Sequence, residues 1–118
     1  MIRKLLLTLC VVAFPAAAQQ ASEAAGAQVR GVDKITGEIY DMRIKSGETV
    51  LLDQINITLN SCRYPLGNPA GDAFASLDVT DVTKGESLFS GWMIASSPAL
   101  SAMEHPRYDI WVIRCTTS

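Results

Sequence analysis

The sequence has little of what metal and redox sites require. It has one histidine, His105, and three cysteines in 118 residues, with no Cys-x-x-Cys pair. Because a closed zinc site normally takes four cysteine or histidine ligands, these residues argue against a structural metal. The sequence also has no phosphate-binding glycine loop, no calcium loop and no Gly-x-Ser-x-Gly elbow. We therefore expect a protein without a cofactor or metal and without enzymatic activity.

The chain also has no excess of positive charge. Ten basic residues stand against twelve acidic ones, for a formal charge of −2. Beyond the first few residues the basic positions are scattered among acids, whereas proteins that bind nucleic acid gather them into a patch or stripe. The charge distribution therefore argues against nucleic acid as a partner, and against an anionic membrane surface for the same reason.

No apolar run is long enough to cross a membrane. The longest, Leu5 to Phe14, has ten residues, where a spanning helix needs about 20. Arg3 and Lys4 precede it, and the small residues Ala16 to Ala18 follow it, which is the pattern of a secretory signal peptide. We expect cleavage after Ala18, so that residues 1–18 are the signal peptide and the mature protein is periplasmic or secreted.

Removal of the signal peptide changes the cysteine count. Cys10 lies in the apolar run and leaves with it, so Cys62 and Cys115 are the pair that remains. An even number of cysteines in a small exported protein favours a disulfide. Two of the ten basic residues leave as well, so the formal charge of the mature chain becomes −4.

Most of the mature chain has the pattern of an all-β protein. Residues 19–28 are rich in alanine with no apolar face, and we expect a flexible leader there. From residue 29 to 118, short runs of β-branched and aromatic residues alternate with turn residues, which is typical of a single β-rich domain. The expected strands are Gln28 to Ile35, Glu38 to Lys45, Thr49 to Leu52, Ile55 to Cys62, Phe74 to Val82, Leu88 to Ala95 and Arg107 to Cys115.

The connections between these strands have recognisable signals. Thr36-Gly37 predicts a tight hairpin, and five breakers between Pro65 and Gly71 predict an irregular loop. Ser97 before Pro98 fits the N-cap of a short α or 3₁₀ helix. The last strand is apolar on both faces, so we expect it to be central. The predicted fold is a small antiparallel β-sandwich or barrel with one short helix.

Two alternatives compete for the chemistry of the C-terminal third. A weak hydrolase would use Ser97 as nucleophile, His105 as base and Asp109 to orient the imidazole. The residue types are present, but a capping role explains Ser97 and a solvent-facing strand position explains Asp109.

A small-ligand or glycan-binding domain would instead use Trp92, Tyr108 and Trp111 as an aromatic platform, with Arg107 as a polar contact. Against it, aromatic side chains fill the cores of small domains. For Trp111 we favour the core, and for Trp92 the choice stays open because Gly91 beside it could mark a bulge or a close backbone approach.

The segment FSGWMIASSPALSAMEHPRYDIWVIRC, from Phe89 to Cys115, resembles a bacterial secreted family known as domain of unknown function 2155. Val32 to Gly37 and the turn Ser46 to Thr49 share the resemblance, which covers Val29 to Cys115. Both Cys62 and Cys115 match positions where the family has cysteine. The resemblance implies a signal-bearing periplasmic β-domain, and it assigns no catalytic residue.

The resemblance also suggests a partner. Members of this family are often encoded near an accessory subunit of respiratory complex I, which implies a periplasmic role on an inner-membrane assembly. We therefore expect a non-enzymatic interaction or accessory protein whose partner is a protein, with an exposed apolar patch near Trp92 and the short helix. The candidate interaction surface is Trp92, Met93, Ser97, Leu100, His105, Arg107 and Tyr108.

Overall fold

The computed structural model describes residues 21–118. The predicted signal peptide, its cleavage site after Ala18, and Cys10 lie outside the described residues. Periplasmic localisation therefore stays a prediction from the sequence.

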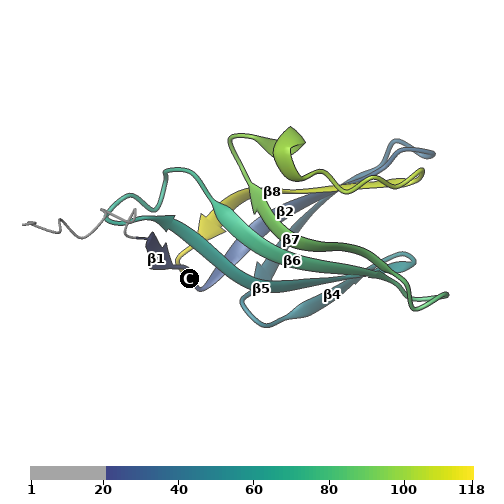
Figure 1. Ribbon diagram of the computed structural model, residues 1–118, viewed down its shortest axis with the longest axis horizontal. Helices are drawn as coiled ribbons and strands as arrows, with labels where there is room; N and C mark the ends of the chain where they lie inside the picture. Colours follow the sequence, from purple (N-terminus) through teal and green to yellow (C-terminus); the bar gives the residue numbers. More distant parts are fainter. Residues whose placement is uncertain (1–20) are drawn as a thin grey trace, which may run out of the picture.

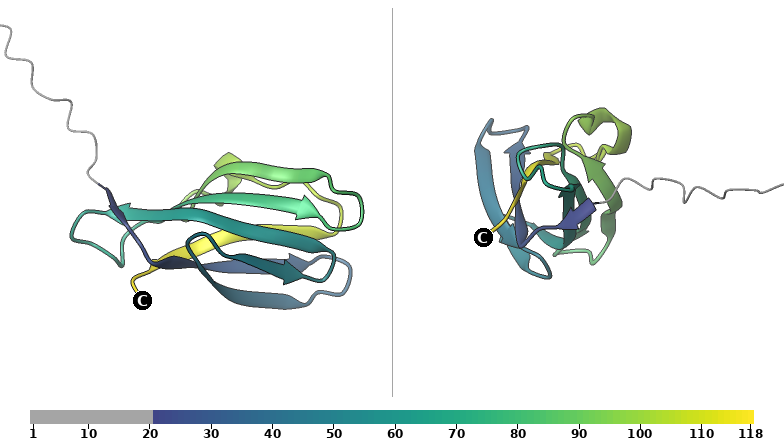
Figure 2. Two further views of the ribbon diagram at one scale, coloured as in Figure 1. Left: turned by 90° about the horizontal axis from the view of Figure 1, so that it is seen from below. Right: turned by 90° about the vertical axis from the view of Figure 1, so that its left-hand side faces the viewer.

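The described residues form an all-β domain of two antiparallel sheets with one short 3₁₀ helix (Figure 1). One sheet, called sheet A, has the strand order β1-β5-β6-β7, with β4 also paired to β5; the other, sheet B, has the order β3-β2-β8. The end-on view in Figure 2 shows the two layers of the sandwich. The elements are β1 (Ala21–Glu23), β2 (Gly26–Asp33), β3 (Ile39–Lys45), β4 (Thr49–Leu52), β5 (Ile55–Pro65), β6 (Phe74–Asp81), β7 (Ser87–Ile94), η1 (Pro98–Ser101) and β8 (Tyr108–Thr116).

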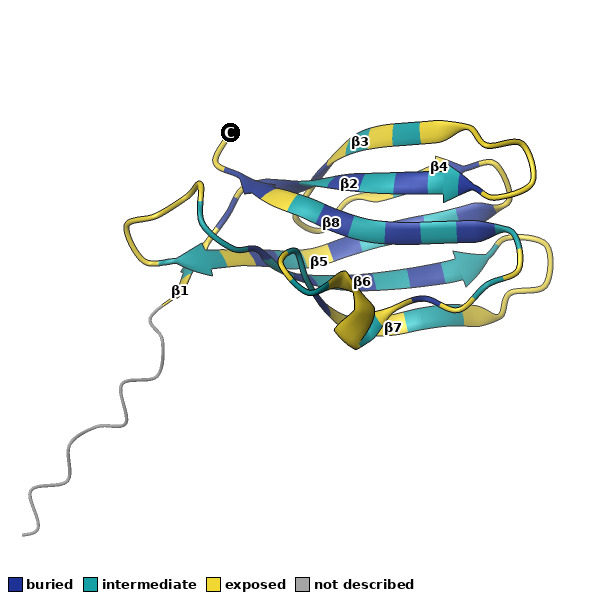
Figure 3. Cartoon of the chain, turned by 90° about the horizontal axis from the view of Figure 1, so that it is seen from above, coloured by how far each residue is buried: buried dark blue, intermediate teal, exposed yellow. Residues whose placement is uncertain are grey.

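The core lies between the sheets, and strand periodicity produces it. Successive side chains of a strand point to opposite faces, so buried residues alternate with less buried ones along most of β2, β5, β6 and β8, as the bands in Figure 3 show. The largest fully buried side chains include Ile55, Ile57 and Leu59 of β5, Leu77 of β6 and Ile110 of β8. The predicted all-β sandwich is confirmed.

The predicted disulfide is also confirmed. Cys62 of β5 and Cys115 of β8 are bonded across the two sheets, with their Cα atoms 5.7 Å apart. Each cysteine has an alanine as its strand neighbour, because Cys62 is paired with Ala75 and Cys115 with Ala27. These alanines are fully buried, so the sheets lie close together where the bond joins them.

The prediction of a flexible leader is wrong for residues 21–28. These residues form β1 and the start of β2, and Ala24 and Ala27 are buried in the core. The physical reason is space: beside the disulfide the sandwich has room only for small side chains. A run of alanine and glycine that appeared too small to bury a face is the run that fits there.

The last strand is at an edge, not in the centre as predicted. β8 pairs with β2 alone and is the outer strand of sheet B. Its outward-facing residues, Asp109, Trp111 and Ile113, are half-buried rather than exposed, and Trp111 packs against the core. The sequence of β8 is apolar on both faces because both faces of this edge strand are at least partly buried.

Two hairpins have turns of the same kind, in which an aspartate accepts hydrogen bonds from the backbone amides that follow it. In the first, Asp33 Oδ1 accepts hydrogen bonds from the amides of Ile35 and Thr36, and the Gly37 amide donates to the Asp33 carbonyl. In the second, Asp81 Oδ1 accepts hydrogen bonds from the amides of Thr83 and Lys84, and the Gly85 amide donates to the Asp81 carbonyl. Both glycines have positive φ, +78° and +68°. The predicted Thr36-Gly37 hairpin is present, with a loop longer than two residues.

The short helix is present, but its expected cap is absent. Pro98–Ser101 forms one 3₁₀ turn after Ser97, whose side chain makes no capping hydrogen bond. The Leu100 amide donates to the Ser97 carbonyl instead. The helix buries none of its residues, and Leu100 is 74% exposed.

Candidate functional site

The strand register gathers a group of large side chains on the outer face of sheet A. Arg63 of β5 is opposite Phe74 of β6, and Phe74 is opposite Ile94 of β7. One step along, Trp92 is opposite Ser76. Because residues i and i+2 of a strand share a face, Trp92 and Ile94 lie on the same side of β7. Four side chains from three strands thus meet outside the core.

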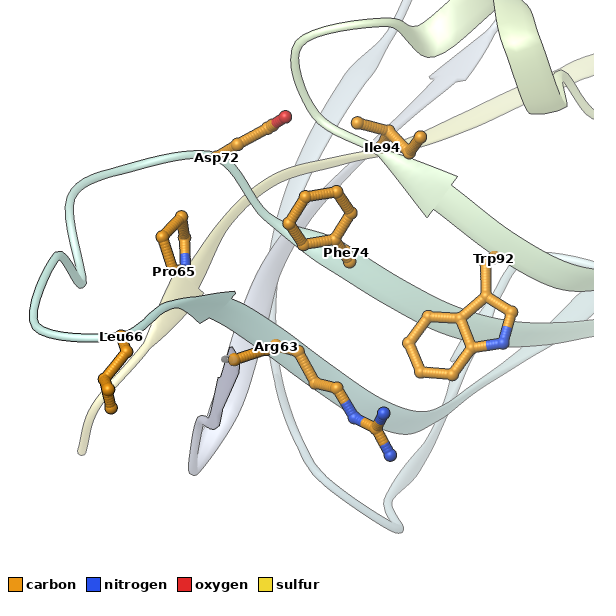
Figure 4. A pocket seen from close by; sticks show the side chains of 8 residues that line it. Arg63, Pro65, Leu66, Asp72, Phe74, Trp92 and Ile94 are labelled. Atoms are coloured by element: carbon orange, nitrogen blue, oxygen red, sulfur yellow. The ribbon is translucent and has the colours of Figure 1, made fainter. Parts of the chain in front are cut away.

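These side chains line a groove of about 750 Å³ with a predominantly apolar surface. In Figure 4, Phe74 lies at the centre of the groove. Trp92 and Arg63 lie on one side of it, and Pro65 and Leu66, where the loop after β5 begins, lie on the other. The lining residues are Ala21, Arg63, Pro65, Leu66, Asp72, Phe74, Trp92 and Ile94. Trp92 is 44% exposed and Leu66 is 61% exposed. Large apolar side chains are therefore open to solvent in one concave region.

Arg63 supplies the positive charge of the groove. Its guanidinium carbon lies 5.2 Å from the centroid of the Trp92 ring, within the range of a cation–π contact. The nearest carboxylate is that of Glu23, with an oxygen 3.9 Å from Arg63 Nε, and both side chains are about half exposed or more. A surface pair of this kind stabilises little, so the guanidinium can bind an incoming anion.

Asp72 lies at another rim of the groove, and its carboxylate is already satisfied. Oδ1 accepts hydrogen bonds from the amides of Ala73 and Ser96, and Oδ2 accepts one from the Ser96 hydroxyl. Burial alone would raise the pKa of Asp72, but these hydrogen bonds outweigh it and lower the pKa below its ordinary value. Asp72 therefore fixes the loop to the end of β7.

Apart from the exposed Leu51 of β4, the centre of the outer face of sheet A is polar and internally bonded. Asp78 accepts hydrogen bonds of 2.6 Å from the Ser90 hydroxyl and 2.9 Å from Asn60 Nδ2. These two hydrogen bonds lower the pKa of Asp78. A satisfied polar network therefore lies beside the apolar groove, which contains one loosely paired cation.

The predicted interaction surface is not a single surface. Met93 and Tyr108 are each 2% exposed, so their side chains belong to the core, and their assignment as surface residues is wrong. The reason is strand alternation: Met93 follows outward-facing Trp92 and points inward. Trp92 and Leu100 are exposed, and Ser97, His105 and Arg107 are half-buried.

Arg107 belongs to a charged cluster at the opposite end of the sandwich. Its Nη2 lies 3.0 Å from Asp33 Oδ2 and 3.1 Å from Asp53 Oδ2, and Asp53 also accepts a hydrogen bond from the Tyr108 hydroxyl. Burial would raise the pKa of Asp33, but hydrogen bonds from Arg107 and from two turn amides lower it overall. Arg107 is therefore bound to Asp33 and Asp53, and it does not lie beside Trp92 as the polar contact of an aromatic platform.

The three aromatic residues of the proposed platform lie apart. Trp92 is on the outer face of sheet A, while Tyr108 and Trp111 belong to β8 of sheet B. Tyr108 is buried, with Arg107 5.2 Å from its ring centroid and the His105 ring stacked at 5.4 Å. Trp92 and Phe74 line the groove of sheet A instead.

The proposed hydrolase residues are not connected as a triad. Nδ1 of His105 accepts hydrogen bonds of 3.1 Å from the amides of Arg107 and Tyr108. In a triad this nitrogen must instead donate to the orienting carboxylate. Within residues 21–118, no hydrogen bond joins Ser97, His105 and Asp109.

No group of three or more histidine, cysteine, aspartate or glutamate side chains in residues 21–118 is placed to hold a metal ion. Among the same residues, no helix has the length and apolar character needed to span a membrane.

Sequence reasoning missed most of the groove. Phe74 and Ile94 could have been paired from the hairpin between the two predicted strands, because that hairpin fixes which residues face each other. Arg63, Pro65 and Leu66 precede a long irregular connection, and no local signal sets their register with β6.

Comparison with known proteins gives a family but no function. The family model described as "Uncharacterized protein conserved in bacteria (DUF2155)" matches residues 27–115. The chain is 32% identical over 91 residues to the uncharacterized protein RP359 of Rickettsia prowazekii (strain Madrid E), an alignment that covers 75% of this chain and 59% of that protein. The chain thus spans about three fifths of the length of this curated relative. No solved structure matches.

Proposed function

The chain belongs to the bacterial DUF2155 family of uncharacterised proteins, and we propose that it is a non-enzymatic accessory protein that docks on a larger assembly through the groove of sheet A. The observation that carries this proposal is the exposure of Trp92 and Leu66 beside Phe74 and Arg63. Tryptophan and arginine are the residues most enriched among those that dominate the energy of protein interfaces. Contact with a partner would remove this apolar surface from water.

The proposed location is the bacterial envelope. The signal-like N-terminus and the disulfide between Cys62 and Cys115 both support an oxidising, extracytoplasmic compartment. We propose the periplasmic face of an inner-membrane respiratory assembly, with complex I as the first candidate partner. The resemblance to the family supports that choice.

The test is co-purification of a tagged protein from envelope solubilised in mild detergent. Trp92→Ser should lose the stoichiometric partner, because it removes the largest exposed ring of the groove. Leu51→Ser is the matched control, since Leu51 is 65% exposed on β4 and does not line the groove. Recovery of no stoichiometric partner by the wild-type protein, or equal recovery by both variants, would overturn the proposal.

A second candidate function is binding of a small ligand or a glycan in the same groove. The observation that favours it is the Arg63 guanidinium over the Trp92 ring at the side of an apolar concavity of about 750 Å³, a size typical of small-molecule sites. A ligand that binds the native state raises its melting temperature. A panel of glycans and aromatic carboxylates should then stabilise the wild-type protein and leave Trp92→Ser unchanged.

A further inference from the structure

The Arg63 guanidinium in the groove does not form a closed ion pair. A second arginine of the same protein gives a direct comparison: Arg30 lies opposite Asp41 in antiparallel register, as Arg63 lies opposite Glu23. Arg30 makes a bidentate pair, with hydrogen bonds of 2.7 Å and 3.1 Å. Arg63 Nε stays 3.9 Å from Glu23 Oε1, which is beyond hydrogen-bond distance. The same cross-strand arrangement thus leaves Arg63 without a bonded carboxylate.

Arg63 and Glu23 each have another contact. Oε1 of Glu23 already accepts a hydrogen bond of 3.1 Å from the Ser61 hydroxyl. The guanidinium carbon of Arg63 lies 5.2 Å from the centroid of the Trp92 ring. A cation–π contact uses no hydrogen-bond acceptor, and among the described residues Arg63 donates no side-chain hydrogen bond. Its N–H donors are therefore available to an anion.

The groove beside this guanidinium is apolar, with a negative charge at its other rim. Phe74 and Ile94 form the apolar surface. In Figure 4 the Asp72 carboxylate lies across the Phe74 ring from the Arg63 guanidinium, and its oxygens are already hydrogen-bonded. Since like charges repel, a second carboxylate is disfavoured next to Asp72. Among the lining residues, Arg63 alone attracts an anion, and apolar surface lies beside it.

We infer that the groove recognises a segment of the partner protein in which a carboxylate side chain stands beside an aromatic or aliphatic one. The carboxylate binds the Arg63 guanidinium, whose planar fork suits a pair of parallel hydrogen bonds, and the apolar side chain packs on Phe74 and Ile94. This inference rests on the proposed function and names the chemistry of its partner. Charge complementarity with Arg63 requires the carboxylate, and repulsion by Asp72 fixes the direction of the segment.

Glu23 competes with the carboxylate of the partner. An incoming carboxylate must displace Glu23 from the neighbourhood of Arg63 or bind beside it. Binding beside it has a parallel in this protein, because Arg107 contacts both Asp33 and Asp53. In either case the negative charge of Glu23 opposes binding. Neutralising Glu23 should therefore strengthen binding, a gain that damage to the fold would not produce.

The test uses a phage-displayed library of random peptides as the probe. Phage that bind the Trp92→Ser variant are removed first, and the remainder are selected on the disulfide-bonded wild-type protein, so that the retained peptides need the groove. We expect enrichment of aspartate or glutamate beside an aromatic or aliphatic residue. The most enriched peptide is then synthesised in two forms, one with its acidic residue and one with the corresponding amide, and both are titrated against the protein.

Three variants with checked melting temperatures assign the contact. Arg63→Gln should weaken binding of the acidic peptide about tenfold, the loss expected for a hydrogen bond to a charged group, and should bind the amide peptide as the wild type does. Glu23→Gln should strengthen binding of the acidic peptide about threefold. Arg30→Gln is the matched control, because it removes an equal charge outside the groove, and it should bind as the wild type does.

Enriched peptides that need Trp92 but carry no acidic residue overturn the inference and leave the docking function standing. Equal binding of the acidic peptide by Arg63→Gln and Arg30→Gln has the same consequence. If no peptide is enriched the inference also fails, and stabilisation by an aromatic carboxylate then assigns the groove to a small ligand. A dimer of the purified protein that Trp92→Ser dissociates overturns it too, because the occupant is a second copy. The envelope co-purification judges the docking function separately.

Discussion

The Tyr108 hydroxyl donates a 2.5 Å hydrogen bond to Asp53 Oδ2, which ties the first residue of β8 to the turn between β4 and β5. Asp53 has a φ of +51°, unusual for a residue other than glycine, and its carboxylate also binds Arg107. At the opposite end of β8, Cys115 is bonded to Cys62 of β5. The edge strand β8 is therefore fixed to sheet A at both ends.

Replacing Tyr108 with phenylalanine should weaken the first of these two fixtures. Tyr108→Phe keeps the buried ring and removes the hydroxyl that bonds to Asp53. We expect the free energy of unfolding in urea to fall by about 1.5 kcal/mol, the lower end of the range for a hydrogen bond to a charged group, because the Asp53 side chain is partly exposed. Asp53→Asn, which retains an oxygen that accepts this hydrogen bond, should cost less at this contact, and a Tyr108→Phe variant as stable as the wild type would contradict the role of the contact.

Loss of the disulfide should have a larger effect. Cys62 and Cys115 are 53 residues apart, for which the chain-entropy model gives a stabilisation of about 4 kcal/mol. The free energy of unfolding in urea, measured with and without reductant, should differ by at most about 4 kcal/mol. The Cys62→Ser/Cys115→Ser variant should match the reduced protein, and it should be insensitive to reductant.

The Asp33–Arg107 pair should make stability depend on acid pH. The pKa of Asp33 is lower in the folded protein than in the unfolded chain, so the folded state binds fewer protons in this range. The stabilisation is fully present above the unfolded pKa of about 4 and is lost as pH falls through the folded value. Arg107→Gln removes the guanidinium that helps to lower this pKa, so its stability should depend less steeply on pH below about 4.

Urea titrations of unfolding at a series of pH values from neutral to acid would check this prediction. Asp33→Asn should reduce the same slope, because it removes the titrating group. The expectation fails if the wild type and both variants lose stability in parallel as the pH is lowered.

Local signals predicted most of the fold. The alternation of Ile55, Ile57 and Leu59 with polar residues identified β5, and the signal-like pattern of the N-terminal sequence together with the cysteine count predicted the disulfide. The strand β1 escaped prediction because its residues, Ala21–Glu23, have no apolar periodicity of their own. It forms because it pairs with the end of β5, and that contact is not local in the sequence.

The groove was harder to predict than the fold. Its aromatic residue Trp92 was a candidate from the sequence, but Met93 and Tyr108 were placed beside it on the basis of chain proximity. In a strand, neighbours point to opposite faces, so chain proximity separates side chains rather than gathering them. Arg63 reaches Trp92 across two strand pairings, and the register shift between Leu59 and Ser61 alters the alignment of one of them.

Gly26, the first residue of β2, lies in close contact with the end of β3. A Cβ atom on Gly26 would lie 2.3 Å from the Ile44 carbonyl oxygen, a backbone atom that sheet pairing holds in place. Gly26→Ala should therefore lower stability by about 2–3 kcal/mol, a drop in Tm of roughly 10–20 °C for a domain of this size. Gly91→Ala is the control, because the nearest atom to its Cβ would be the Phe89 ring at an ordinary 3.6 Å, so its Tm should stay at or slightly above that of the wild type. Equal melting temperatures for the two variants would show that the contact between the start of β2 and the end of β3 is more adaptable than its backbone geometry implies.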